Sequence, residues 1–104
     1  MKDIEFLGTS LEDLTAFPVE AKKLAGYQLH RVQSGLNPSD WKPMSSVAQG
    51  VREIRIKHGT QSRVIYLAND GKKVYVLHAF IKKTQRTPKA DIDLAKKRYR
   101  SIKR

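Results

Sequence analysis

The chain has 104 residues, of which 39% are hydrophobic and 30% are charged, and it contains no cysteine. This length predicts one domain, residues 1–104, with a core of modest size. The composition excludes disulfides, thiolate zinc sites and cysteine nucleophiles, and no apolar run approaches the roughly 18 residues of a membrane helix. Residues 1–10 carry acids beside a single lysine, which is not the charge pattern of a signal peptide, so we expect a cytoplasmic protein without a membrane partner.

The net charge of +11 is unevenly distributed along the chain. Residues 1–51 contain five Lys or Arg and six Asp or Glu, whereas residues 52–104 contain sixteen and four, so the two halves carry −1 and +12. A small protein polarised in this way usually binds a polyanion, and a generally solubilising surface is the alternative. We therefore expect contact with a nucleic acid or with the ribosome.

The first elements are predicted from short local signals. Residues 4–7 predict a short strand. Ser10 is followed three residues later by an acid, as in a capping box, so a short helix is expected to begin there. That helix should end at Phe17, because Pro18 disfavours helix at the residue before it and suits the first turn of a new helix.

Apolar residues follow the helical period from residue 19 to about residue 34, and Gly35 is a plausible C-cap. The N-terminal third is therefore predicted to be a helical hairpin. Residues 36–50 contain two prolines and several small polar residues, so we expect a loop. Trp41 and Met44 are expected to attach this loop to the core.

Three strands are predicted at residues 51–57, 62–68 and 74–83. The first alternates between apolar and charged residues, and the other two are apolar on both faces over most of their length. Residues 58–61 form the first predicted hairpin loop. Asp70-Gly71 is a strong signal for the second, so the three strands should form an antiparallel meander.

A two-residue turn at Asp70-Gly71 would place Arg63 opposite His78 and Tyr66 opposite Tyr75. This register puts one set of residues on one sheet face: Arg63, Ile65, Val76, His78, Phe80 and Lys82. Lys83 would lie on the other face unless the strand ends or bulges before it.

The register of the first hairpin has two alternatives. A four-residue loop sets Lys57 opposite Ser62 and pairs Arg63 with Ile56. A loop one residue longer sets Lys57 opposite Arg63 and places Arg55, Lys57 and Arg63 on one face.

Thr87-Pro88 predicts the start of a final helix, with Thr87 as N-cap and Pro88 in the first turn. The helix has one apolar face, formed by Ile92, Ala95, Tyr99 and Ile102. Its other positions are strongly basic and include Lys96, Lys97 and Arg100, which form either a solvated face or an RNA-binding face.

The three histidines have no metal-ligand spacing, and there is no glycine-rich phosphate loop, so no metal and no cofactor are expected. RNA cleavage by the 2′-hydroxyl requires only groups that hold the phosphate, neutralise its charge and move protons. Arginine binds phosphate through its planar fork, and a lysine crowded by cations has a lowered pKa. His78 has a suitable intrinsic pKa for proton transfer, although a histidine in an apolar run is also typical of a core.

Three segments carry a resemblance to a known family: residues 51–56 (Val-Arg-Glu-Ile-Arg-Ile), 62–66 (Ser-Arg-Val-Ile-Tyr) and 76–88. The last, Val-Leu-His-Ala-Phe-Ile-Lys-Lys-Thr-Gln-Arg-Thr-Pro, is the most specific. With Lys42-Pro43-Met44 before the sheet, they resemble the phage-derived Gp49-like group of HigB-type toxins in the RelE/ParE superfamily, over about residues 10 to 104.

This resemblance implies an α+β, RelE-like fold: an N-terminal helical hairpin packed on a small antiparallel sheet, with a C-terminal helix. It implies a type II toxin that enters the ribosomal A site and cuts mRNA as a ribosome-dependent endoribonuclease, without a metal. The implied partners are the ribosome, mRNA and a helix-turn-helix antitoxin. A ParE-like gyrase inhibitor and a non-enzymatic RNA-binding domain are the alternatives.

By position, Arg63 resembles the family's phosphate-binding arginine, and Arg55 resembles a basic strand position of the family. Lys83, with Lys82 beside it, resembles the basic residue that ends the family's last strand. Glu53 departs from the family pattern, in which a second lysine is common, and no tyrosine stands near the start of the last helix. His58 or His78 could replace that tyrosine as the acid, or Lys83 could move both protons. The remaining cations are expected to bind RNA: Lys57, His58, Arg86, Lys96, Lys97 and Arg100.

Overall fold

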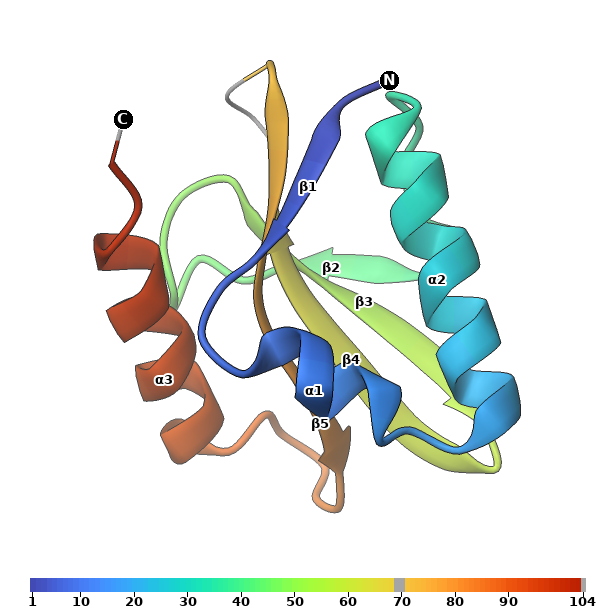
Figure 1. The fold of residues 1–104 in the computed structure, drawn as a ribbon. Coiled ribbons are helices and arrows are strands. Elements are labelled where there is room, and N and C mark those ends of the chain that lie inside the picture. The colour runs from blue at the N-terminus through green and yellow to red at the C-terminus, as the bar shows by residue number, and fades with distance from the viewer. Residues whose placement is uncertain (69–70, 104) are drawn as a thin grey trace.

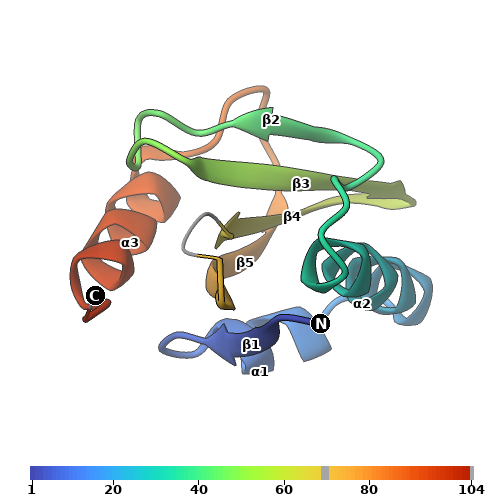
Figure 2. The same ribbon diagram turned by 90° about the horizontal axis from the view of Figure 1, so that it is seen from above.

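The computed structural model describes residues 1–68 and 71–103. Its elements are β1 (Asp3–Phe6), α1 (Ser10–Thr15), α2 (Val19–Gln33), β2 (Trp41–Pro43), β3 (Val51–His58), β4 (Thr60–Leu67), β5 (Lys73–Lys82) and α3 (Lys89–Arg100). The strands form one sheet in the order β1-β5-β4-β3-β2, with α1 and α2 on one face and α3 on the other (Figures 1 and 2). The predicted α+β class is confirmed. No helix among these described residues is long and apolar enough to span a lipid bilayer.

The sheet is larger than the predicted meander because both of its edges gain a short strand. The predicted N-terminal strand is present as β1, which pairs with β5 in parallel. The predicted loop 36–50 contains β2, which pairs with β3 through Trp41↔Ile54 and Pro43↔Arg52. A proline is tolerated there because an edge strand does not need every backbone N–H for pairing.

Two apolar clusters lie on opposite faces of the sheet. The first joins Leu14 of α1, Phe17 after it, and Ala21 and Leu29 of α2 to the strands. The second packs Ala95 of α3 against its own set of strand and loop residues, which includes Met44, Val51, Ile65, Leu67 and Leu77. The loop residue Met44 is 5% exposed, so it attaches its loop to the core as predicted. α3 lies nearer the start of β3 than its end (Figure 2).

The helices lie where the sequence predicts them, but α1 ends at Thr15, two residues before the predicted end at Phe17, and two N-termini also differ. Thr9, not Ser10, precedes α1, and the Ser10 hydroxyl donates to the carbonyl of Val76 at 3.2 Å. Pro88, not Thr87, precedes α3, because the Thr87 hydroxyl is bonded elsewhere. In both cases a long-range partner inside the protein replaces the local cap. α2 ends as predicted, and Gly35 follows it with φ of 85°, a left-handed conformation that glycine adopts at low cost.

The predicted register of the second hairpin is wrong. The structure pairs Arg63 with Phe80 and Tyr66 with Val76, and the register shifts between Ile65 and Tyr66. Asn69 and Asp70 of the predicted turn lie outside the described residues. An irregularity of one residue reverses the side-chain alternation. Val76 therefore lies with Tyr66 in the first apolar cluster, on the face opposite to the one predicted for it.

Neither proposed register of the first hairpin is observed. Lys57 pairs with Gln61 and Arg55 pairs with Arg63, across a tighter connection at Gly59 than either alternative assumed. Opposite residues in an antiparallel pair share a face, so Arg55, Lys57 and Arg63 still lie together. This face, which α3 covers in part, carries the candidate site.

Candidate functional site

A buried carboxylate lies at the centre of the charged part of this face. Glu53 of β3 is 0% exposed. Its Oε1 lies 3.5 Å from Nε of Arg63 and 3.7 Å from Nζ of Lys42, and its Oε2 accepts a hydrogen bond of 2.8 Å from the Thr87 hydroxyl. One carboxylate therefore connects β2, β3, β4 and the segment that leads into α3.

Arg63 is held from several sides. Its side chain is 4% exposed, and besides Glu53 it contacts the carbonyl of Ser62 at 3.0 Å and Oε1 of Gln61 at 2.8 Å. Burial lowers the pKa of Arg63, and the charge of Glu53 opposes this effect. Gln61 is exposed, and its carboxamide oxygen accepts the hydrogen bond of one guanidinium nitrogen at the surface.

Arg55 lies directly across from Arg63 and is held by a second acid. Nε and an Nη atom of Arg55 lie 2.8 Å from Oδ1 of Asp40, and the Arg55 backbone N–H donates to the Asp40 carbonyl. Lys57 approaches the other oxygen of Asp40 at 3.7 Å. The Arg55 side chain remains 34% exposed, so it is fixed in position and still accessible.

Lys82 ends β5 and pairs across the ladder with Gln61. Burial lowers its pKa, the charges of Arg63 and Lys42 lower it further, and Glu53 opposes them. A lysine in these surroundings gives up its proton more readily than a free one and can act in proton transfer. We call Lys42, Arg55, Arg63 and Lys82 the cationic cluster, with Glu53 at its centre.

The structure does not bring Lys83 and His78 into this cluster. Lys83 follows β5, is exposed, and lines a shallow hollow with Asp13 and Phe17 beside α1. The side chain of His78 is 7% exposed, and its Nε2 lies 2.6 Å from Oδ1 of Asp91 in α3. Its ring stacks on Phe80 with centroids 5.0 Å apart. His78 therefore has the surroundings of a core histidine that connects β5 to α3.

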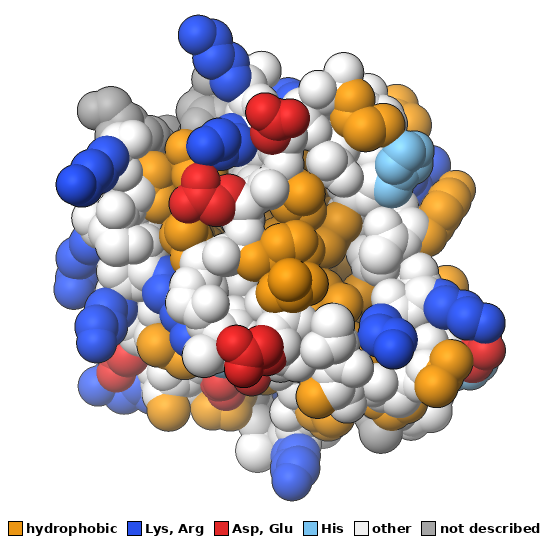
Figure 3. Space-filling model, viewed as in Figure 1, with side chains coloured by type: hydrophobic (Ala, Val, Ile, Leu, Met, Phe, Trp, Pro, Cys, Tyr) orange, Lys and Arg blue, Asp and Glu red, His pale blue; other side chains and the backbone are white. Residues whose placement is uncertain are grey.

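The six expected RNA contacts fall in separate regions. Lys57 and His58 are exposed at the end of β3, and Arg86 is exposed between β5 and α3. On α3, Lys97 and Arg100 are exposed and Lys96 is half-buried. Several Lys and Arg side chains gather along the edge that α3 forms (Figure 3).

Sequence reasoning missed four members of the site: Asp40, Lys42, Glu53 and Thr87. Lys42 stood in a motif shared with the family, but nothing in its local pattern predicted a strand that turns it toward Glu53. Glu53 alternates with apolar residues like a solvated strand position, and only the fold shows it to be buried. An acid within a basic strand was the one available signal.

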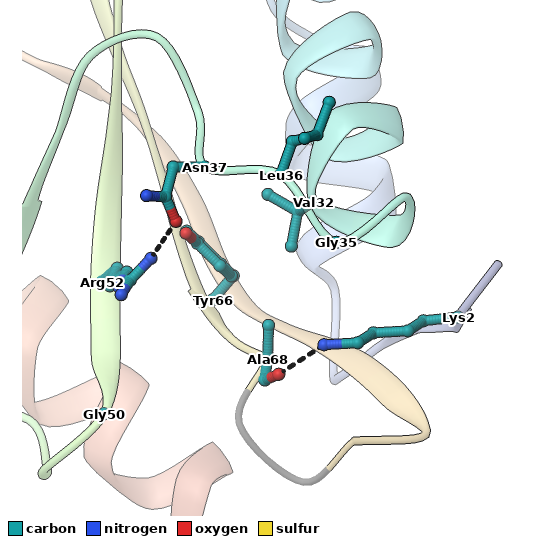
Figure 4. A pocket seen from close by; sticks show the side chains of 9 residues that line it. All are labelled: Lys2, Val32, Gly35, Leu36, Asn37, Gly50, Arg52, Tyr66 and Ala68. Atoms are coloured by element: carbon teal, nitrogen blue, oxygen red, sulfur yellow. Dashed lines mark hydrogen bonds between the residues drawn. The ribbon is translucent and has the colours of Figure 1, made fainter.

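A second hollow of about 260 Å³ lies on the opposite face, between the end of α2 and β3 and β4 (Figure 4). The polar groups on its wall are bonded within the protein. Arg52 donates to Oδ1 of Asn37 at 2.9 Å and stacks over the ring of Trp41 at 3.9 Å, and Lys2 donates to the carbonyl of Ala68. Burial raises the pKa of Tyr66 at its floor. This hollow shares no lining residue with the cationic cluster.

A family model described as phage-derived protein Gp49-like matches residues 12–100. The chain therefore belongs to this family of RelE- and HigB-type toxins, as the sequence motifs predicted. A solved structure, the toxin–antitoxin complex RelBE2 from Mycobacterium tuberculosis, contains a chain with a similar fold. The TM-score is 0.54 at 19% sequence identity, over 78% of this chain and 98% of that chain. No curated protein matches the sequence.

Proposed function

We propose that this protein is the toxin of a toxin–antitoxin pair and cuts mRNA on the ribosome. The observation that supports this most is the cationic cluster. Four cations from four strands lie together with two carboxylates, Glu53 and Asp40, so the group keeps an excess of positive charge. Such a preorganised group suits a phosphodiester, whose negative charge spreads over several oxygens in the transition state. Family membership supports the toxin class.

The reaction requires no change in oxidation state. The 2′-oxygen of one nucleotide attacks the adjacent phosphorus, a new oxygen–phosphorus bond forms, and the bond to the 5′-oxygen of the next nucleotide breaks. One proton leaves the 2′-hydroxyl and one reaches the 5′-oxygen, which yields a 2′,3′-cyclic phosphate and a 5′-hydroxyl. In this proposal Lys82, with its lowered pKa, accepts the first proton; a water molecule gives the second to the 5′-oxygen, and the protonated Lys82 returns its proton to the resulting hydroxide.

Arg55 and Lys42 keep exposed portions of 34% and 37% and would hold the phosphate oxygens. Arg63 lies beneath them and would stabilise the transition-state charge once the Gln61 carboxamide turns away. Lys57, His58 and Arg86, with Lys96, Lys97 and Arg100 of α3, would bind ribosomal RNA in a salt-dependent manner. A helix-turn-helix antitoxin would neutralise the protein in the cytoplasm.

The test compares induced expression of the parent with Lys82→Met and with Lys22→Met, which removes an exposed lysine of α2. We expect the parent and Lys22→Met to arrest growth and to give codon-phased cuts in primer extension on cellular mRNA. Lys82→Met should be folded by circular dichroism and should give neither effect. A Lys82→Met variant as toxic as the parent would refute the assignment, and DNA-damage induction without mRNA cuts would indicate gyrase instead. Lys83→Met shows whether the neighbouring lysine takes part.

A further inference from the structure

A pocket of about 360 Å³ opens beside the cationic cluster. One wall is the chain that follows β2, at Met44, Ser45 and Ser46, and the other is the segment between β5 and α3, at Gln85, Arg86 and Thr87. Lys42 also lines the pocket and contacts Glu53. In Figure 2 both walls lie at the end of the sheet where α3 begins.

The pocket is continuous with the cationic cluster through two residues. Lys42 lines the pocket and approaches one oxygen of Glu53, and Thr87 lines it and donates to the other oxygen. A ligand in this pocket therefore lies next to whatever the cationic cluster binds. The ligand of this pocket need not be a second phosphate, because the lining offers amide, hydroxyl and apolar groups as well as cations.

Both walls are held by hydrogen bonds within the protein. Met44 is buried, and its carbonyl accepts hydrogen bonds from the backbone N–H groups of Val47 and Ala48, which fold the first wall into a compact turn. The second wall is held by the bond from Thr87 to Glu53 and by a bond of 2.6 Å from the Thr84 hydroxyl to the Arg86 carbonyl. A preformed pocket binds a ligand without the cost of ordering its walls.

The chemistry of the lining indicates the class of ligand. Met44, Pro43 and Ile92 offer an apolar surface, while Lys42 and Arg86 are cations and none of the residues that line this pocket is acidic. Among the described residues, no hydrogen bond engages the side chains of Ser45, Ser46 or Gln85. A flat ring with hydrogen-bonding edges, attached to a negative backbone, matches all of these groups.

We propose that this pocket binds one nucleobase of single-stranded RNA, next to the linkage held by the cationic cluster, and that Gln85 and Ser46 read its edge. This inference rests on the proposed function and adds the basis of sequence preference. The volume is near the lower end of the range of small-molecule sites, which fits a single nucleoside. A hydrogen bond from a serine hydroxyl or a side-chain amide to the edge of a base changes the affinity by about fivefold.

The test uses the purified full chain and four RNA trinucleotides that differ in one base and carry a 2′-O-methyl group at each ribose, which prevents cleavage. We expect affinities that differ at least fivefold between bases, with a shift of the Gln85 side-chain amide in nuclear magnetic resonance spectra. Gln85→Ala should reduce the difference to less than twofold. Gln49→Ala, an exposed glutamine in the chain that leads to β3, should keep it.

The outcomes separate this inference from the proposed function. An abasic trinucleotide that binds as tightly as the others would show that only phosphate is recognised and would overturn the inference. If Gln85→Ala and the parent both give codon-phased mRNA cuts with the same base preference, the pocket does not read the base. This inference would then be overturned, while the proposed cleavage would stand. Base-dependent binding that Gln85→Ala removes, in a protein that cuts no mRNA, would support the pocket and refute the cleavage.

Discussion

The buried position of Glu53 leads to a prediction about stability. Glu53→Gln keeps the shape of the side chain and an oxygen that can accept the Thr87 hydrogen bond, but it removes the negative charge. Arg63, whose side chain is 4% exposed, would then retain a buried charge without its acid at 3.5 Å. Removing one partner of such a pair costs about 3–5 kcal/mol in proteins.

Lys42 contributes little to this cost, because its side chain is 37% exposed and lies 3.7 Å from Glu53. We therefore expect Glu53→Gln to lower the free energy of unfolding by about 3 kcal/mol. For a domain of this size the midpoint of thermal unfolding should fall by about 12 °C or more. Urea unfolding followed by circular dichroism measures the first quantity, and calorimetry measures the second.

Two further variants show whether charge is the cause. Glu53→Gln combined with Arg63→Met removes both charges and should recover at least half of the loss, because neither charge is then buried alone. Glu20→Gln breaks an exposed pair with Lys23 and should change stability by less than about 0.5 kcal/mol. A loss below about 1 kcal/mol in Glu53→Gln, or a double variant less stable than either single one, would refute the reasoning.

Two more predictions concern other parts of the structure. The folded protein lowers the pKa of Lys82, so its amine should become neutral at a lower pH than in the unfolded chain. The pH midpoint of Lys82 acetylation, measured by mass spectrometry, should therefore be lower in buffer than in urea. Equal midpoints would contradict the assigned surroundings. Gly8→Ala should lower the free energy of unfolding by about 1–3 kcal/mol in urea titrations, because Gly8 has φ of 56° and an added Cβ would lie 2.5 Å from Nε of Arg98. Gly26→Ala, in open space on α2, should instead raise the free energy of unfolding by about 0.5–1 kcal/mol. An unchanged stability in Gly8→Ala would contradict the first of these two effects.

Apart from β2, the elements of this protein follow from local signals in its sequence. The proline at residue 18 and the glycine at residue 35 bound α2, and the alternation from residue 51 identified β3. These predictions succeeded because backbone conformation responds to near neighbours. The family motifs added the α+β class and the cations of β3, β4 and β5.

The tertiary structure decided which of these residues meet. A register offset of one residue is invisible in a local pattern, yet it reverses the faces of a strand, as at Val76. The three-residue strand β2 exists only because β3 pairs with it, and through it Lys42 reaches Glu53. Lys82 and Lys83 are neighbours in sequence, but the end of β5 directs one toward Arg63 and leaves the other beside α1. Sequence supplied the charges, and long-range pairing of the strands determined which of them act together.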